Sequence, residues 1–412
     1  MSDNNINNVF EEILQPVAHL INNAQELIPK DSETYTLSLK VFTTNLLYAI
    51  ICQIPSIGRL VVEIKTSPTA KKLCLVAASK SMYSEAFVRY NPEIFRKIFS
   101  VMLKASTIIG IPEINQLGQI WLVDGSVFPA ISTMSWAKYK KGANAIKLQM
   151  AFELNRMIPV SFLSTTGNYS EKKFLQDILE QGITYICDRG YISFDLFKRI
   201  CDAKAWFIIR GKEKLKCIYE ESFDIDVPIQ FISFFKEIKD SQVVFINDSN
   251  QKAYRMVEFK ARGELYRLIT NRFDLSTYEI IMLYAYRWQV ELCFRFLKRT
   301  LKGINLFSHD CQGIQIQFYL YMIAYLLLLS FKQKCITSNT DGTVSEVQDQ
   351  APYHNSRNNS SSGRTYVCGL VTLLGDKLKH FWRIGIHWLI AVRNSLLMLY
   401  DDEFLKILGE CT

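Results

Sequence analysis

Three acidic residues of this chain stand where phosphoryl-transfer chemistry could use them. Asp124 follows an apolar run in QIWLVDGS, and Asp188 follows another in ITYICDRGY. A short apolar run closed by an acid is typical of a buried strand that stops at a turn. Glu291 lies in YAYRWQVELCFRFLKR, residues 284–299, which has helical periodicity. Carboxylate oxygens are the ligands that Mg²⁺ prefers in proteins.

The segment that carries Glu291 favours two interpretations. Its charged residues recur every three or four positions, which predicts a single charged stripe along one helix. A second, apolar stripe runs beside it: Leu283, Val290, Phe294, Leu297 and Leu301. Taken alone, the pattern favours a solvated face on which Arg287 and Arg295 form ion pairs with Glu291. A carboxylate between cations can also hold Mg²⁺ while its neighbours hold phosphates.

Asp124 and Asp188 shift the balance towards the second interpretation. In sheets flanked by helices, active sites gather at the carboxyl ends of strands. Two strand-end aspartates and one helical glutamate can supply the ligands of a two-metal site, in which the ions lie about 3.5–4 Å apart. The hypothesis at this stage is Mg²⁺-dependent phosphoryl transfer.

The elements that must position these residues are predicted from hydrophobic periodicity. Strands are expected over 119–123, 145–154, 157–164, 183–187 and 206–210, with helices over 170–181 and 193–205. The strand at 145–154 alternates, which predicts one buried face. Gly182 is expected to close the first of these helices. The order of elements predicts an α/β fold.

Two helix starts are marked by their capping residues. Asn91 followed by Pro92 is typical of a helix N-terminus. Ser276 with Glu279 three residues later forms a predicted capping box, and the helix it opens is expected to reach about Lys302.

Composition limits the class of protein. The chain has 412 residues, 49% hydrophobic content and a net charge of +8, as suits a folded protein with a phosphate-bearing partner. Its ten cysteines are scattered without metal-ligand spacing, which argues against a zinc site or a disulfide framework and favours a reducing, cytoplasmic location. The polar, acidic start is unlike a secretory signal.

One apolar run raises the question of a membrane. Residues 318–331, FYLYMIAYLLLLSF, are shorter than the roughly 20 residues needed to span a bilayer. We therefore expect a core helix and no membrane partner. A membrane-associated helical protein, resting on this run and on 385–399, remains an alternative.

The spacing of four residues resembles a known signature. Tyr284, Arg287, Glu291 and Lys298 fit Y-x2-R-x3-E-x6-K, the YREK signature of the DDE transposases of insertion-sequence family four. LVDGS and CDRGY look like the family's blocks around its first two catalytic aspartates. One departure is KLQ at 147–149, where the family often has KLH. The resemblance covers roughly residues 118–331.

The resemblance implies roles for individual residues. Asp124, Asp188 and Glu291 would be the catalytic, metal-binding triad, holding two Mg²⁺ ions with Mn²⁺ as an acceptable substitute. Tyr284, Arg287 and Lys298 would contact the DNA backbone. Trp288 is a further candidate for stacking on an extruded base, although packing is the more common role of tryptophan.

The resemblance also implies a ribonuclease H-like mixed sheet flanked by helices, with an inserted β-rich module. The expected parts are a helical, DNA-binding N-terminal domain (1–115), a catalytic core (116–210 and 273–334), the module (211–272), a flexible polar loop (335–364) and a C-terminal helical segment (365–412). Such enzymes cut at terminal inverted repeats of double-stranded DNA, join the freed 3′ ends to target DNA and work as a homodimer on DNA.

Two function classes stay open on the sequence. The first is an active transposase, and the second is a transposase-derived DNA-binding protein that has lost catalysis. The sequence does not give the terminal-repeat or target sequences, a hairpin intermediate, the free oligomeric state, the present activity or the role of the 335–364 loop.

Overall fold

The computed structural model describes the chain in several stretches separated by gaps. They are residues 14–21, 35–106, 112–140, 143–228, 235–261, 263–300 and 306–337. Contacts between Cα atoms divide them into two compact units. A helical unit holds the described residues up to 106 together with 306–337, and a sheet unit holds those from 112 to 300. The predicted segment at 365–412, and the predicted loop beyond residue 337, lie outside the described residues.

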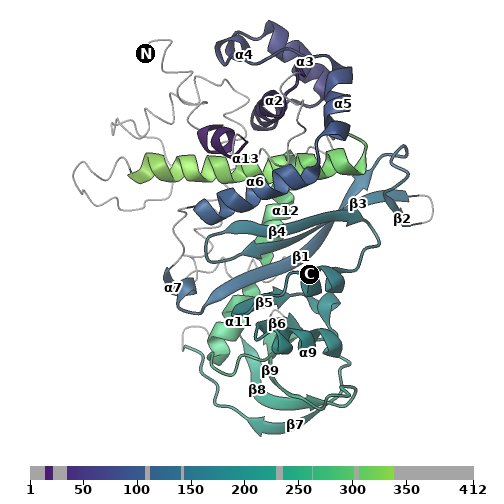
Figure 1. The fold of residues 1–412 in the computed structure, drawn as a ribbon. Coiled ribbons are helices and arrows are strands. Elements are labelled where there is room, and N and C mark those ends of the chain that lie inside the picture. The colour runs from purple at the N-terminus through teal and green to yellow at the C-terminus, as the bar shows by residue number, and fades with distance from the viewer. Residues whose placement is uncertain are drawn as a thin grey trace. The chain divides into compact units, whose positions relative to one another are not determined.

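The helical unit is built from amphipathic and apolar helices (Figure 1). They are α2 (Leu39–Ile51), α3 (Ile57–Thr66), α4 (Pro68–Lys72), α5 (Lys80–Arg89), α6 (Pro92–Ala105) and α13 (Cys311–Thr337). The predicted start of α6 is confirmed, since the Asn91 side chain accepts a hydrogen bond from the Glu93 N–H at 2.9 Å. The described part of the N-terminal region is therefore helical, as predicted.

Helix α13 is longer than the apolar run that predicted it. It has 27 residues and packs against α2, α5 and α6. Within the described residues, its stretch Cys311–Ser330 is the one helix long and apolar enough to cross a membrane, but 72% of the most apolar window is buried inside the structure. The packing agrees with the predicted core helix. Residues 335–337 belong to this helix and not to the predicted polar loop.

The sheet unit contains a single ten-stranded sheet. Its strands are β1 (Gln119–Ala130), β2 (Lys138–Lys140), β3 (Ala143–Glu153), β4 (Ile158–Thr166), β5 (Ile183–Cys187), β6 (Trp206–Arg210), β7 (Cys217–Ser222), β8 (Lys236–Phe245), β9 (Ala253–Ala261) and β10 (Glu264–Thr270). The order is β2-β3-β1-β5-β6-β10-β9-β8-β7, with β4 also paired to β3. The short helix α7 (Pro112–Asn115) precedes β1.

Both parallel and antiparallel pairs occur in this sheet. β1, β5 and β6 are parallel neighbours, whereas β3 and β4, both predicted as strands, form an antiparallel hairpin beside β1. The strands of the predicted module continue the same sheet, because β10 pairs antiparallel with β6. A mixed sheet with helices on it agrees with the predicted α/β class.

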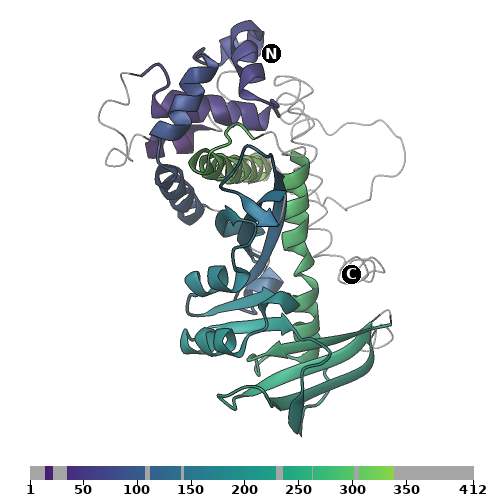
Figure 2. The same cartoon turned by 90° about the vertical axis from the view of Figure 1, so that its right-hand side faces the viewer.

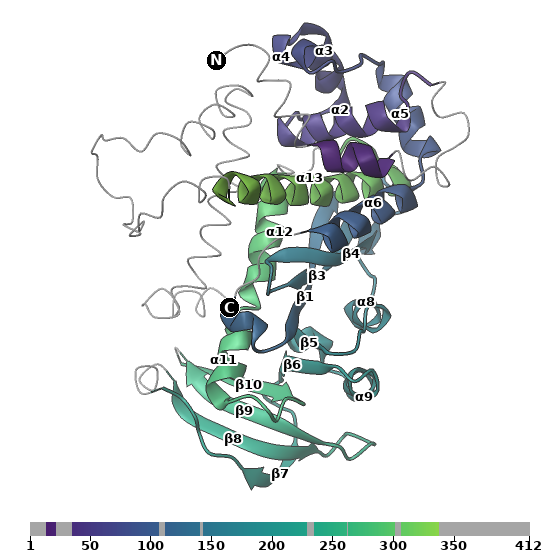
Figure 3. The ribbon, with the colours of Figure 1, turned by 60° about the vertical axis from the view of Figure 1, so that its left-hand side comes forward.

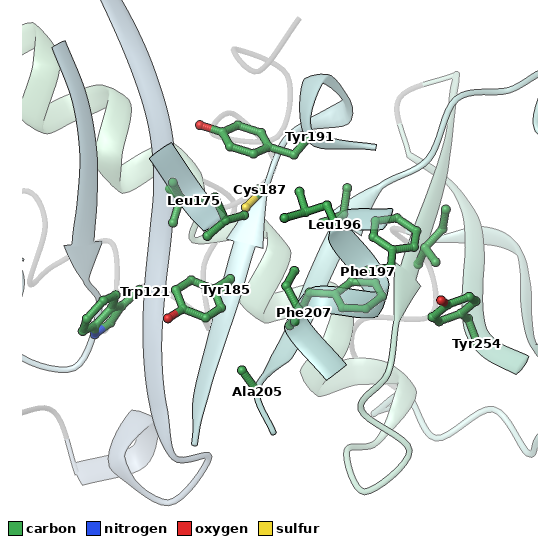
Figure 4. Packing of buried hydrophobic residues seen from close by; sticks show 14 of the residues in the cluster. Trp121, Leu175, Tyr185, Cys187, Tyr191, Leu196, Phe197, Ala205, Phe207 and Tyr254 are labelled. Atoms are coloured by element: carbon green, nitrogen blue, oxygen red, sulfur yellow. The ribbon is translucent and has the colours of Figure 1, made fainter. Parts of the chain in front are cut away.

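Helices cover the two faces of the sheet (Figures 2 and 3). α8 (Glu171–Asp177) and α9 (Phe194–Asp202) lie on one face, and α11 (Thr277–Ala285) and α12 (Trp288–Thr300) on the other. The core under α8 and α9 is rich in aromatic residues (Figure 4). Phe197 of α9 stacks on Phe207 of β6 with ring centroids 4.5 Å apart, and Trp121 meets Tyr185 edge to face.

Two sequence predictions about these elements were wrong. α8 ends at Asp177, and Gly182 instead adopts φ +81° in the turn that leads into β5, so it does not close the helix. β3 is buried on both faces, because α8 packs on the face that the alternating pattern predicted to be exposed: Ala151 of β3 lies in one apolar cluster with Phe174 and Leu175 of α8. Gln149, on the face expected to be polar, is fully buried.

A buried ionic network fixes the start of α11. Arg255 of β9 donates to both carboxylate oxygens of Asp240 on β8, at 2.9 and 2.6 Å. Asp240 also accepts a hydrogen bond from the Thr277 hydroxyl at 2.8 Å, and Arg255 donates to the Leu275 carbonyl. These bonds tie the chain just before α11 to the outer strands, and so set the direction in which α11 and α12 run.

Candidate active site

Asp124 and Asp188 come from neighbouring parallel strands. β1 and β5 pair in register from Gln119–Ile183 to Val123–Cys187, and each aspartate is the next residue after the last pair. The register therefore brings the two carboxylates side by side at the carboxyl end of the parallel pairing, where α/β folds place ligands. Their proximity shows in the electrostatics, because Asp188 contributes to the raised pKa of Asp124.

The two aspartates differ in their backbone setting. β5 ends at Cys187, so Asp188 stands at a strand end as predicted. β1 continues through Asp124 to Ala130, because β3 stays paired with it as far as the Ala130–Asn144 pair. The prediction that a strand stops at Asp124 was therefore wrong; only its parallel partner stops there.

Local hydrogen bonds orient both carboxylates. Asp124 Oδ1 accepts a hydrogen bond from the Gly125 N–H at 2.7 Å. Asp188 caps the short 3₁₀ turn Arg189–Tyr191, and its Oδ1 accepts from the Gly190 N–H at 2.8 Å. Each acid is thus held by the backbone N–H of a glycine one or two residues further on.

The helix that carries Glu291 is broken. The sequence predicts one helix from Ser276 to about Lys302, whereas the structure has α11 and α12. The predicted capping box at Ser276 is confirmed. At the break, the N–H groups of Arg287, Gln289 and Val290 bond to carbonyls three residues earlier, at 3.0, 2.9 and 3.3 Å. This tighter turn changes the helical rotation between Tyr284 and Glu291.

The break separates the predicted stripe of charges. Tyr284 and Arg287 are each only 7% exposed, whereas Arg295 and Lys298 are exposed. The solvated charged face that the helix pattern favoured by itself is therefore not formed, although the Arg287–Glu291 ion pair that it predicted is present. The apolar stripe is confirmed for its described members, since Leu283, Val290, Phe294 and Leu297 are buried. Leu301 lies outside the described residues.

Arg287 connects two of the three candidate acids. Its Nη1 lies 3.6 Å from Asp124 Oδ2, and its Nη2 donates to Glu291 Oε1 at 2.7 Å. Glu291 stands in the first turn of α12, the helix that packs along β1 (Figure 3). The guanidinium thus joins the α12 acid to the β1 acid across the face of the sheet.

At this site, burial and neighbouring charges act in opposite directions on the pKa values of Asp124 and Arg287. Burial raises the pKa of Asp124 to about 7, with Asp188 and Glu291 adding to the rise and Arg287 opposing it. Burial alone would lower the pKa of Arg287, but Tyr284, Asp124 and Glu291 together raise it, so the guanidinium stays charged. A divalent cation bound beside Asp124 would therefore favour loss of the Asp124 proton.

The candidate DNA-contacting residues on these helices differ in how far they are exposed to solvent. The Arg287 guanidinium lies over the Tyr284 ring, 6.0 Å from its centroid. Trp288 is 7% exposed and is covered by Arg295, whose Cζ lies 5.4 Å from the ring centroid. Lys298 is exposed and its Nζ lies 5.4 Å from the Phe128 ring centroid. Lys298 is thus the candidate DNA contact that is accessible in this arrangement.

The three carboxylates are the kind of ligand that a hard divalent cation prefers, although they do not converge on one point. Asp124, Asp188 and Glu291 offer carboxylate oxygens, and the single positive charge of Arg287 does not neutralise all three, which favours a bound cation. Among the described residues, no group of three or more acidic, histidine or cysteine side chains is close enough to hold one ion. Arg287 lies between Asp124 and Glu291, which accounts for carboxylates that are coupled without converging.

Two residues beside the aspartates were missed by the sequence analysis. Glu171, the first residue of α8, forms an ion pair of 2.6 Å with Lys147 of β3. The pair lies next to Gly125 and Gly190, the glycines that follow Asp124 and Asp188. The glycines after both acids were visible in DGS and DRGY, but nothing in the sequence connected them to Glu171.

Comparisons with known proteins agree on one family. Residues 115–327, just over half of the 412, match the family described as transposase DDE domain. A Sinorhizobium fredii protein named as transposase y4zB is 28% identical over 214 residues, covering 50% of this chain and 59% of that protein. A Geobacillus stearothermophilus protein named for insertion sequence element IS5377 is 25% identical over 199 residues, covering 47% and 52%.

A third relative extends the match. A Synechocystis protein named for insertion sequence element IS4SA is 24% identical over 264 residues, which is 60% of this chain and 70% of that protein. The chain spans a little over half the length of the first two relatives. The matched region runs through the whole sheet unit from just before β1 and into α13.

Proposed function

Since this chain belongs to the family of DDE transposases, we propose that it cuts DNA at the terminal inverted repeats of an insertion sequence and joins the freed ends to target DNA. The relatives that are named for insertion sequence elements support a mobile-element substrate. The proposed chemistry is phosphoryl transfer with divalent metal ions.

One observation carries the proposal. The β1–β5 register makes Asp124 and Asp188 neighbours, and Arg287 ties Glu291 to Asp124. Three carboxylates from two strands and a helix are thereby coupled at one end of the parallel pairing. In an ordinary surface ion-pair network the aspartate would be exposed to solvent. Asp124 is instead buried, and its pKa is raised to about 7.

In the proposed reaction the role of the three carboxylates would be to hold the metal ions. Asp124, Asp188 and Glu291 would hold two Mg²⁺ ions, which when bound supply activation of the attacking oxygen and stabilisation of the leaving oxygen. Cleavage forms a bond from the oxygen of water to phosphorus and breaks the bond from phosphorus to the 3′ oxygen. The freed 3′ hydroxyl then attacks a target phosphodiester, and the displaced target oxygen takes up a proton.

The neighbouring cations would hold the DNA backbone. Lys298 is exposed and can contact a phosphate directly. Arg287 is bound to Asp124 and Glu291, so it would reach a phosphate only after cations replace it there. Tyr284 and Trp288 are largely buried, and their proposed DNA contacts would need the same local opening. Two copies of the chain would bridge the two ends of the element.

The test uses purified full-length protein and a duplex carrying the inverted repeats that flank the gene. With Mg²⁺ we expect cleavage at the repeat end, and Glu291→Gln, Asp124→Asn and Asp188→Asn should each abolish it. Asp195→Asn, which removes an equal charge from an exposed ion pair on α9, serves as the control and should cleave normally.

Two outcomes would count against an active enzyme. Full cleavage by Glu291→Gln would remove Glu291 from the site. Specific binding of the repeat duplex by the wild type, without cleavage in Mg²⁺ or Mn²⁺, would favour the alternative of a transposase-derived DNA-binding protein.

A further inference from the structure

A fourth carboxylate, that of Glu171, lies against the glycines that follow the two aspartates: Gly125 within β1 and Gly190 in the 3₁₀ turn. A Cβ atom built on Gly125 would lie 3.1 Å from Glu171 Oε1, and one built on Gly190 would lie 3.4 Å from Glu171 Oε2. The Gly190 position is also 2.9 Å from Asp188 Oδ1, so the carboxylates of Glu171 and Asp188 flank the same small space. A side chain at position 125 would therefore crowd Glu171, whereas one at position 190 would first crowd the Asp188 carboxylate.

Glu171 is held in place by Lys147. Their ion pair of 2.6 Å is partly protected from water, with 28% of the Glu171 side chain and 13% of the Lys147 side chain exposed. Lys147 also donates to the Tyr169 carbonyl at 3.4 Å, just before α8. Since Lys147 lies on β3 opposite Val127 of β1, the pair links α8 to the strand next to the one that carries Asp124.

Glu171 differs from an ordinary helix-start glutamate in what it touches. An acid in the first turn of a helix is favoured by the helix dipole and by little else. Here one of its oxygens lies beside Gly125 of β1 and the other beside Gly190 of the 3₁₀ turn. Glu171 therefore lies between β1 just after Asp124 and the turn just after Asp188, beyond Val123–Cys187, the last pair of the β1–β5 register.

From this geometry we infer that Glu171, locked by Lys147, is a positioning residue that sets the spacing of Asp124 and Asp188 for the divalent ions of the proposed reaction. The inference rests on the proposed function, because it presumes that those aspartates bind metal. Glu171 acts through β1 at Gly125 and through the 3₁₀ turn at Gly190, and not on the DNA, so its effect should appear in metal affinity before it appears in DNA binding.

The probe is Mn²⁺, titrated into the full chain without DNA and followed by the electron paramagnetic resonance signal of the free ion. Glu171→Gln should weaken Mn²⁺ binding about tenfold or more, as residues that orient metal ligands generally do. Asp177→Asn is the matched control, since it removes an equal charge from an exposed position at the other end of α8. It should bind Mn²⁺ as the wild type does.

The variant Lys147→Gln distinguishes a positioning role of Glu171 from an effect of net charge alone on Mn²⁺ binding. Removing a cation near a metal site should tighten Mn²⁺ binding if only charge matters, whereas losing the anchor of Glu171 should weaken it. Gly125→Ala changes no charge, yet its new Cβ would push against both Glu171 Oε1 and Lys147 Cε, so it should also weaken binding. Thermal denaturation of each variant confirms that it is folded.

The outcomes distinguish this inference from the proposed function. Mn²⁺ binding that is weakened by Asp124→Asn but unchanged by Glu171→Gln, or tightened by Lys147→Gln, would overturn the inference alone. A wild-type chain that binds no Mn²⁺ would overturn it as well. Failure of the wild type to cleave repeat DNA, with Mn²⁺ affinity still lowered in Glu171→Gln, would instead contradict the proposed function.

Discussion

The guanidinium of Arg287 lies 3.6 Å from the carboxylate of Asp124 and also binds Glu291. One positive charge of the protein itself thus faces two of the three proposed metal ligands. Burying a carboxylate without such a partner costs several kcal/mol, on the order of what one buried ion loses in leaving water. Arg287 therefore offsets only part of the negative charge of the three carboxylates, and a divalent ion would offset more of it.

Arg287→Gln should destabilise the metal-free protein. It leaves Asp124 and Glu291 without their cation, and breaking a buried ion pair in this way costs about 3–5 kcal/mol. The measurement is the free energy of unfolding in urea with a chelator present. Mg²⁺ should restore part of the loss, because it supplies the missing positive charge to the same carboxylates.

The control for Arg287 is Arg199→Gln, which breaks an exposed ion pair with Asp195 on α9. Its unfolding midpoint should not change, since exposed pairs are screened by water and salt. If Arg287→Gln also left the unfolding midpoint unchanged, the ion pairs of Arg287 would make no contribution to the free energy of unfolding.

The stability of the metal-free protein should depend on pH through Asp124. Its folded pKa of about 7 exceeds the value of an unfolded aspartate, so folding favours the protonated form. The stability that this group contributes is present below the unfolded pKa and is lost as pH rises through about 7. Asp124→Asn, which is always neutral, should therefore stabilise the metal-free chain at about pH 8.5 and much less at about pH 5.

Thermal denaturation of wild type and Asp124→Asn across that pH range checks this expectation. The difference in melting temperature should grow as pH rises. A constant difference at all pH values would mean that Asp124 does not titrate in this window.

Lys298→Ala should change the salt dependence of DNA binding. Lys298 is exposed on α12, and a lost phosphate contact reduces the slope of log affinity against log salt by about one. The measurement is the affinity for repeat DNA at several salt concentrations without Mg²⁺. Lys198→Ala, on the exposed surface of α9, is the control and should leave the slope as in the wild type.

Ser276→Ala should weaken the anchor of α11. The Ser276 hydroxyl accepts a hydrogen bond from the Glu279 N–H at 3.2 Å, and Glu279 bonds back to the Ser276 N–H at 2.7 Å. Losing an N-cap costs about 1 kcal/mol in the free energy of unfolding. Ser276→Asp keeps an acceptor at the cap and should unfold close to the wild type. Equal losses in both variants would show that the cap itself is not the cause.

Much of the secondary structure could be predicted because its signals are local. The caps at Asn91 and Ser276 satisfy backbone groups within three residues, and the apolar runs before Asp124 and Asp188 mark their own strands. The errors occur where a distant partner decides the outcome. β1 runs past Asp124 because β3 pairs with it, and β3 buries its second face because α8 packs against it.

By itself, the sequence determined the chemistry available to this protein: three acids at the ends of apolar runs and on a helix, with cations at fixed spacing around one of them. Only the tertiary structure decided how those charges are used. The helix break at Arg287 turns that residue inward to Asp124 and Glu291, and packing of α8 brings Glu171 to the glycines after both aspartates. Spacing along a chain fixes which residues share a helix face, but contacts across the sheet depend on strand register and packing.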